Sequence, residues 1–212
     1  MDNSHAAPRV SPTVLRVDWE HLFDDLEGQL AAEWEAERAA LDAESERLRI
    51  SKLTLPDRLR VLAAARSPVQ LQLLDGSRRS ASVRVVGADW IGVGSDDDSR
   101  LRIVPIRAIV SLGVDHGALL SSLTAPTEEA GLRGRMSFGF VLRDVARRRT
   151  PVTVAVGSGD PMHGSIDRAG ADHLDLALHD ADEVRRARAV RGFRSIPFAA
   201  VAWVRLEGAA DL

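Results

Sequence analysis

A histidine- and aspartate-bearing segment near the C-terminus is the first candidate for chemistry. His173, Asp175 and His179 are of types that coordinate metal ions, and strand alternation would place all three on one face, opposite a row of leucines. His173 and His179 are six residues apart, which is about 20 Å along an extended strand and too far for a single ion to bridge. We therefore expect a solvent-facing strand surface and no metal site.

Other candidate catalytic patterns are incomplete. Asp96, Asp97 and Asp98 lie together but lack the glycine and the distal glutamate of a calcium-binding loop. Ser165 and His163 could in principle form a nucleophile and a base, but as neighbouring strand residues they are not expected to meet. No G-x-S-x-G motif and no phosphate-binding glycine loop is present. We expect neither an enzyme nor a cofactor.

Arginine clusters are the strongest candidates for a binding surface. Because a guanidinium group binds phosphate bidentately, they could contact a nucleic-acid backbone. The favoured alternative is an acidic protein partner, either the acidic N-terminal helix of this chain or another chain. The first cluster is Arg147, Arg148 and Arg149, and the second, called here the arginine loop, is Arg185, Arg186, Arg188 and Arg191.

An internal repeat predicts the elements that would position these residues. Residues 59–69 (LRVLAAARSPV) match residues 142–152 (LRDVARRRTPV) at an offset of 83, and residues 104–109 match 196–201 at an offset of 92. The second copy therefore contains nine inserted residues between these two anchors. Internal repetition of this kind predicts two copies of one supersecondary unit.

Each copy should contain one short helix and five short antiparallel strands. Thr54 and Asp57 form a capping-box pattern at the first helix, and Asp75-Gly76 is a hairpin turn signal. The predicted strands are 69–73, 80–86, 90–94, 101–104 and 108–112, and then 152–156, 163–168, 173–179, 194–196 and 199–206. Five such strands can close into a small barrel. The predicted core residues are Leu71, Val83, Ile91 and Ile109, with their counterparts Val154, Ile166, Leu174 and Val201.

A long acidic amphipathic helix is predicted for residues 17–52. Residues 1–50 carry 12 acidic and 5 basic side chains. An apolar stripe follows the helical period and should be buried in a dimer or against another part of the chain. Its candidate interface residues are Trp19, Phe23, Leu26, Leu30 and Trp34.

The complete domain prediction contains six segments. Residues 1–16 form a mobile tail, and the long helix follows at 17–52. The first helix-plus-barrel repeat covers 53–114 and the second covers 135–206, with a linker at 115–134 and a tail at 207–212.

The order of elements, the Asp-Gly turn and the V-P-I-R-A-I segment that introduces the last strand of the first copy resemble the Sm-like (LSm/Hfq-type) fold, an SH3-like barrel. The resemblance covers residues 54–114 and 136–206. Sm-like proteins bind RNA through an asparagine and through an Arg-Gly or Lys-His pair before the last strand, and of these positions only Arg107 carries over as a contact. The layout, with its DWEHLFDDLEGQL opening, also resembles a family of uncharacterised tandem-barrel proteins of GC-rich bacteria.

The sequence thus predicts an α+β protein in which a long helix precedes two tandem Sm-like barrels. The expected function is that of a non-enzymatic scaffold or adaptor that acts through protein–protein contacts and self-assembles. An RNA- or DNA-binding regulator that uses a basic patch on the second barrel is the alternative. No apolar run is long enough to span a bilayer and no basic-then-apolar leader pattern is present, so we expect a cytoplasmic protein without membrane contact.

Overall fold

The computed structural model describes residues 19–95, 98–124, 131–180 and 190–207. The chain divides into two units, Met1–Lys52 and Leu53–Leu212. Within the described ranges, no helix combines the length and the apolar content needed to cross a membrane.

The first unit is built on helix α1, Trp19–Ser51, which confirms the predicted long helix. The side chain of Trp19, one of the candidate interface residues, lies outside the described part. The apolar stripe is exposed in the single chain, with Trp34 at 69% exposure. The burial predicted for the stripe is therefore not provided within the described part of the first unit.

The second unit contains one antiparallel sheet of ten strands in the order β5-β1-β2-β3-β4-β10-β6-β7-β8-β9. We call β1 to β5 the first half and β6 to β10 the second half. The first-half strands are β1 Pro68–Leu73, β2 Arg78–Val86, β3 Trp90–Ser95, β4 Asp98–Pro105 and β5 Ile109–Gly113. The second-half strands are β6 Pro151–Val156, β7 Met162–Ala169, β8 His173–Leu178, β9 Gly192–Pro197 and β10 Val201–Leu206.

The predicted α+β class is confirmed, but the two closed barrels are not. The sheet is open, with β5 at one end and β9 at the other. The reason is the pairing of β4, which joins β10 of the second half through Val204 opposite Ile103 and Arg205 opposite Arg102. A strand edge used in this way cannot also close its own half.

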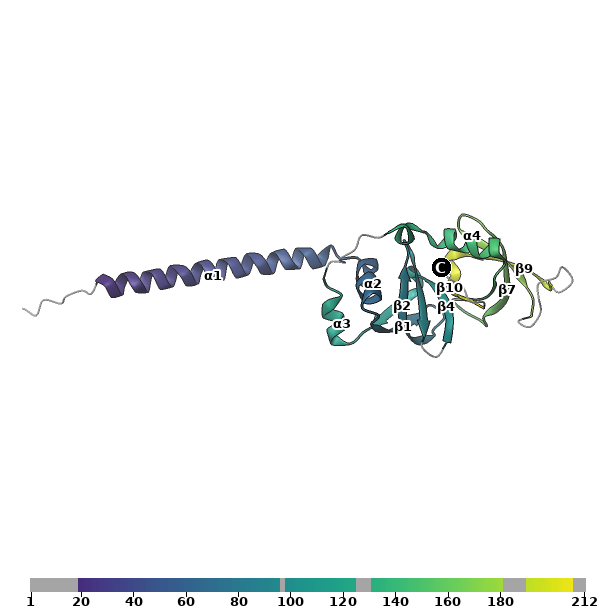
Figure 1. The fold of residues 1–212 in the computed structure, drawn as a ribbon, viewed down its shortest axis with the longest axis horizontal. Helices are drawn as coiled ribbons and strands as arrows, with labels where there is room; N and C mark the ends of the chain where they lie inside the picture. Colours follow the sequence, from purple (N-terminus) through teal and green to yellow (C-terminus); the bar gives the residue numbers. More distant parts are fainter. Residues whose placement is uncertain (1–18, 96–97, 125–130, 181–189, 208–212) are drawn as a thin grey trace, which may run out of the picture. The chain divides into compact units, whose positions relative to one another are not determined.

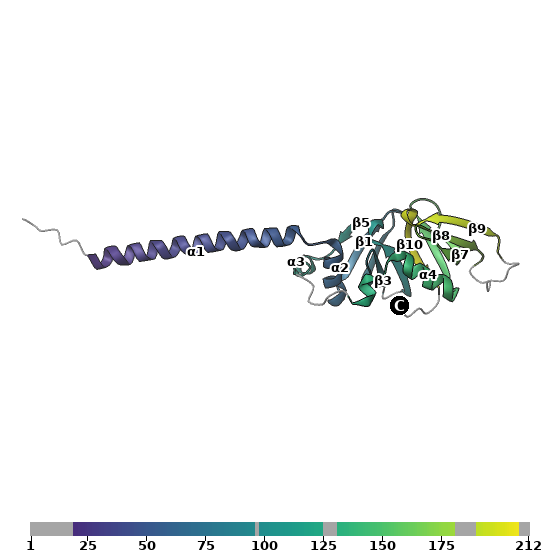
Figure 2. The ribbon, with the colours of Figure 1, turned by 90° about the horizontal axis from the view of Figure 1, so that it is seen from above.

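Short helices accompany each half of the sheet. Helix α2, Leu55–Ala64, begins with the predicted capping box between Thr54 and Asp57, in which each residue binds the other's backbone amide. Helix α3, His116–Ser121, lies inside the segment predicted as a linker. In both views α3 lies beside α2 (Figure 1 and Figure 2), and Arg58 of α2 donates to the Ser122 hydroxyl just after α3.

Helix α4, Phe138–Arg148, packs on β7 of the second half. Its first amide, at Phe138, donates to Asp89 Oδ1 of the first half at 2.6 Å. The remaining short elements are the 3₁₀ helices η1 Ile106–Ala108, η2 Leu132–Arg135 and η4 Phe198–Ala200.

The two halves exchange core residues. The hydrophobic cluster of the first half includes Trp203 of β10, whereas the cluster of the second half includes Trp90 and Ile103 of the first. On β4, Ile103 and Val104 are adjacent and both fully buried, in different clusters. Because neighbouring strand residues point to opposite faces, the two cores lie on opposite faces of the sheet at β4.

The predicted core positions are buried in both halves with one exception. Ile109 is only partly buried, because it belongs to β5, which ends the sheet and has a neighbour on one side only.

Candidate functional site

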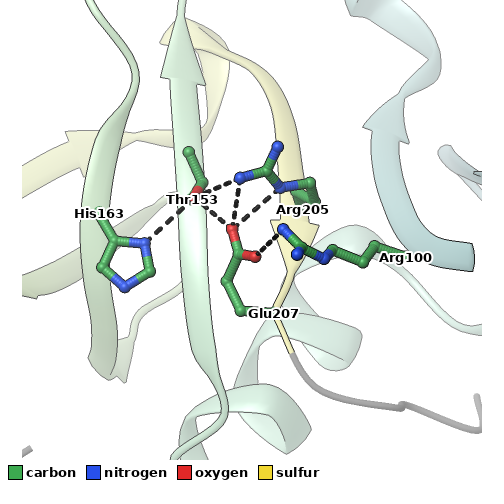
Figure 3. Close-up of polar contacts among 5 residues, drawn as sticks. All are labelled: Arg100, Thr153, His163, Arg205 and Glu207. Carbon is green, nitrogen blue, oxygen red and sulfur yellow. Dashed lines mark hydrogen bonds and ion pairs between the residues drawn. The ribbon is translucent and has the colours of Figure 1, made fainter. Parts of the chain in front are cut away.

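A row of polar residues crosses the junction between the two halves. Arg102 of β4 lies opposite Arg205 of β10, Arg205 lies opposite Thr153 of β6, and Thr153 lies opposite His163 of β7. Residues directly opposite each other in a sheet share a face and interact. The register therefore brings together side chains that are distant in sequence, and we call this set, with Glu207 and Arg100, the polar ladder. Figure 3 shows its members other than Arg102.

Glu207 is the centre of the polar ladder. Its Oε1 accepts a hydrogen bond from Thr153 Oγ1 at 2.5 Å and from Arg205 Nε at 2.9 Å. Its Oε2 pairs with Arg100 Nη1 at 2.8 Å. The carboxylate thereby connects β4 of the first half with β6 and β10 of the second, as Figure 3 shows.

The donors and acceptors around Thr153 can be assigned from this geometry. The Thr153 hydroxyl donates its hydrogen bond to Glu207, so its oxygen can only accept further hydrogen bonds. Arg205 Nη2 donates to it at 3.4 Å, and His163 Nδ1 lies at 3.2 Å. His163 therefore carries its proton on Nδ1 toward Thr153.

Electrostatics keep Glu207 ionised. Burial raises the pKa of this carboxyl, because its side chain is only 14% exposed. The hydrogen bonds from Thr153 and Arg205 and the charges of Arg205 and Arg100 together outweigh burial, and the pKa lies below its usual value. A carboxylate held in this way is a structural acceptor, because every shift other than burial favours the charged form.

A buried serine–histidine pair lies nearby in the second half. Ser165 Oγ is 2.8 Å from His179 Nε2, and the residues are 0% and 4% exposed. His179 Nδ1 lies 2.9 Å from the backbone oxygen of Asp180, which fixes the proton on Nδ1 and leaves Nε2 to accept from the serine. The ring of His179 meets that of His163 edge-on at 5.4 Å between centroids.

This pair corrects one prediction. His179 does not point outward with His173 and Asp175, because β8 ends at Leu178 and the alternation of the strand no longer applies. Ser165 contacts His179, a pairing that was not predicted from the sequence. The pair has the spacing of a nucleophile and a base, but burial of Ser165 keeps its hydroxyl from a substrate in this conformation.

The remaining members of the predicted metal set make ordinary polar contacts. His173 Nδ1 pairs with Asp172 at 2.9 Å, and Asp175 accepts from Ser195 Oγ at 2.5 Å. Among the described residues, no group of three or more potential ligands is placed to hold a metal ion. Asp96 and Asp97, and the side chain of Asp98, lie outside the described part.

The structure describes some of the predicted contact arginines. Three of them pair with aspartates, and Arg107 lies beside an aromatic ring. Arg147 and Arg148 both pair with Asp144 on their own helix α4. Arg149 caps the C-terminus of that helix with a left-handed backbone. The guanidinium carbon of Arg107 lies 5.7 Å from the ring centre of Phe138. In the arginine loop, Arg191 pairs with Asp180, and Arg185, Arg186 and Arg188 lie outside the described residues.

Sequence reasoning missed the polar ladder, although part of its signal was present. Arg100 and Arg102 alternate with Leu101 and Ile103, which indicates that the arginines share one face of β4. Nothing in the local pattern relates them to Glu207, which was placed in a C-terminal tail, since that contact depends on strands paired across 107 positions of the chain.

The chain matches no protein-family model, no curated protein and no solved structure. The geometry of the described residues is therefore the basis for a functional interpretation.

Proposed function

We propose that the protein is a non-enzymatic scaffold that assembles with itself edge to edge through two Sm-like units in each chain. The observation that carries this proposal is the open sheet, whose terminal strands are β5 and β9. Unpaired strand edges are templates for pairing with another chain.

The equivalence of the two units is supported by backbone features that recur at the repeat offset. Arg66 and Arg149 both end a helix in the left-handed region, at φ 50° and 53°, and the turn glycines Gly76 and Gly159 have φ 78° and 91°. The amide of Gly87 donates to the oxygen of Trp90 at 2.8 Å, and that of Gly170 donates to His173 at 2.9 Å.

Strand order makes the two free edges complementary to each other. Numbered within its own half, each half has the order fifth, first, second, third, fourth. The internal junction joins the fourth strand of one half, β4, to the fifth strand of the other, β10. The strands left at the ends are a fifth strand, β5, and a fourth strand, β9. The junction inside the chain is thus a template for a junction between chains.

The free edges present backbone groups at defined positions. On β9, Phe198 N donates to Asp172 O at 2.7 Å, so alternation turns the backbone of Ser195 away from β8 and toward the edge. On β1, the amide of Leu74 donates to Ala108 beside β5, and the same alternation turns Leu112 of β5 outward. Val110 and Phe193, on these strands, are 56% and 58% exposed.

The repeat predicts the register of the contact between chains. At the offset of 92, Val204 corresponds to Leu112 and Ile103 corresponds to Ser195. Since Val204 lies opposite Ile103 inside the chain, Leu112 of one copy should lie opposite Ser195 of the next. The backbone groups of both residues point outward, so the predicted register also satisfies their hydrogen bonds.

Cysteine cross-linking tests this register directly, because the natural chain has no cysteine. Opposite strand residues have Cα atoms about 5.5 Å apart, within the roughly 4.4–6.8 Å range of disulfides. The double variant Leu112→Cys with Ser195→Cys should form interchain disulfides on mild oxidation and give a ladder of oligomers in a denaturing gel. The matched control, Leu112→Cys with Arg194→Cys, should not, because Arg194 points to the opposite face.

Edge pairing of this kind is head-to-tail, so it builds rings where the rotation closes and filaments where it does not. Light scattering of the natural protein should show an assembly that depends on concentration. A monomer at all accessible concentrations, or equal cross-linking of the two cysteine pairs, contradicts the proposal.

A further inference from the structure

An open pocket of about 360 Å³ lies on the core-facing side of β1 to β4 in the first half. This is within the roughly 300–1,000 Å³ typical of small-molecule sites. Its floor is made by buried leucines and valines, and no described residue that lines it is acidic. Its polar lining consists of Arg78, Arg79, Ser80, Ser95 and Arg102.

Strand register places two of these arginines at core-facing positions. Arg79 of β2 lies opposite Leu71, and Arg102 of β4 lies opposite Val93. Leu71 and Val93 are buried core residues, and opposite residues share a face. The two guanidinium groups therefore occupy the face of the sheet that a core would ordinarily fill with apolar side chains.

The ring of Trp203, on β10, makes cation–π contacts with both guanidinium groups. The guanidinium carbons of Arg79 and Arg102 lie 5.2 and 5.8 Å from the centre of its ring, within cation–π range. The indole nitrogen of Trp203 donates to Asp75 Oδ2 at 2.6 Å, which fixes the orientation of the ring. A residue from the second half thus contacts two arginines that line the pocket of the first.

Arg79 has a donor that nothing in the described structure satisfies. Its Nε is buried, and no described residue accepts a hydrogen bond from it. A buried donor without an acceptor is costly. The nearby Asp75 carboxylate interacts with the charge of Arg79 but accepts its hydrogen bonds from Ser77 and Trp203. An anion placed in the pocket would supply the missing acceptor.

We propose that this pocket binds a small phosphate monoester, with the phosphate held by Arg79 and Arg102 on the core-facing side, Arg78 contributing positive charge at the exposed rim, and the remainder of the molecule on the apolar floor. The guanidinium group matches two phosphate oxygens at once, and Ser80 and Ser95 also line the pocket. The site lies within one chain, so it does not depend on the assembly proposed above.

Calorimetric titration of the full chain tests the site with defined probes. Inorganic phosphate and a nucleoside 5′-monophosphate should both bind at constant ionic strength, the monoester more tightly, and the same nucleoside without its phosphate should not. A 5′-phosphorylated oligonucleotide distinguishes a free monoester from a nucleic-acid end, and it should bind no more tightly than the monophosphate. Absence of phosphate binding, or binding of the bare nucleoside alone, overturns the proposal.

Substitutions locate the binding in this pocket. Arg79→Met should weaken monophosphate binding about tenfold or more, the effect of losing one charge-assisted hydrogen bond, and Arg79→Lys should restore part of it. Arg133→Met removes an exposed arginine of η2 outside the pocket and should leave affinity unchanged. Circular dichroism of each variant establishes that it is folded, and Arg78→Met, at an exposed rim position, provides a second variant. Equal affinity of the natural chain and both Met variants at positions 78 and 79 refutes the assignment.

Discussion

Replacing Glu207 by glutamine tests whether the polar ladder stabilises the junction between the two halves of the sheet. The substitution keeps the size of the side chain and removes its charge. It weakens the pairs with Arg205 at 2.7 Å and Arg100 at 2.8 Å and the hydrogen bond from Thr153 at 2.5 Å. The pair with Arg100 contributes less than the others, because the Arg100 side chain is 51% exposed and solvent screens it.

The expected cost is set by the better buried contacts. Hydrogen bonds to charged groups contribute about 1.5–3 kcal/mol each, and adjacent ones are not additive. We expect Glu207→Gln to lower the free energy of unfolding at pH 7 by about 1–3 kcal/mol. For a unit of this size, each kcal/mol corresponds to a decrease of about 2–4 °C in Tm.

The effect of Glu207→Gln on stability should depend on pH in a defined direction. The folded-state pKa of Glu207 is lowered, so its carboxylate contributes stability at pH values above the unfolded pKa, and this contribution is lost as the pH falls through the folded pKa. The difference between the natural chain and Glu207→Gln should therefore be full at pH 7 and should shrink on acidification, when both side chains are neutral.

Urea unfolding followed by tryptophan fluorescence measures this difference, since Trp90 and Trp203 are both buried. The control is Glu46→Gln on helix α1, where a glutamate also pairs with an arginine, Arg49, at 2.6 Å but is exposed; it should leave the midpoint unchanged. The reasoning is refuted if Glu207→Gln is as harmless as the control at pH 7, or if its deficit persists undiminished at acid pH.

Three further measurements follow from the same structure. Ile166→Ala, in the core of the second half, should cost about 2–5 kcal/mol, and Ile109→Ala, on the partly buried edge strand, should cost less in the same urea experiment. Asp89→Ala removes the acceptor of the Phe138 amide and should cost about 1 kcal/mol, with faster amide exchange at the start of α4; unchanged protection there would contradict it. Changing all four arginines of the arginine loop to alanine should leave RNA affinity weak and its salt dependence unaltered, whereas loss of a tight, salt-sensitive complex would favour the nucleic-acid regulator over the scaffold.

Local sequence signals predicted the elements well, because each has a short-range physical cause. The capping box at Thr54 and the turn at Asp75-Gly76 depend on residues within a few positions, and both are present in the structure. Alternation likewise predicted burial at positions such as Val83 and Leu174. These are the parts of the fold that a strand or helix determines by itself.

The open sheet could not be predicted in the same way. Alternation on β4 shows that Arg102 and Ile103 face opposite sides, but it does not show that each side is covered by a different half of the chain. A polar residue at a core-facing position, such as Arg79, is predicted from the sequence pattern to be on the surface, because the pattern does not show which residues lie opposite it. The open sheet arises from pairing between β4 and β10, strands separated by most of the unit, and β10 also carries Trp203, which contacts Arg79.

The position of Trp203 has a consequence for how the chain folds as it is synthesised. Domains generally fold from the N-terminus during synthesis, yet the core of the first half contains Trp203, which lies 90 positions after Gly113, the last residue of that half's strand β5. The first half must therefore leave the ribosome with an incomplete core and with the edge of β4 unpaired. It reaches its final structure only when β10 emerges, so deletion of β10 should destabilise the half that was made first.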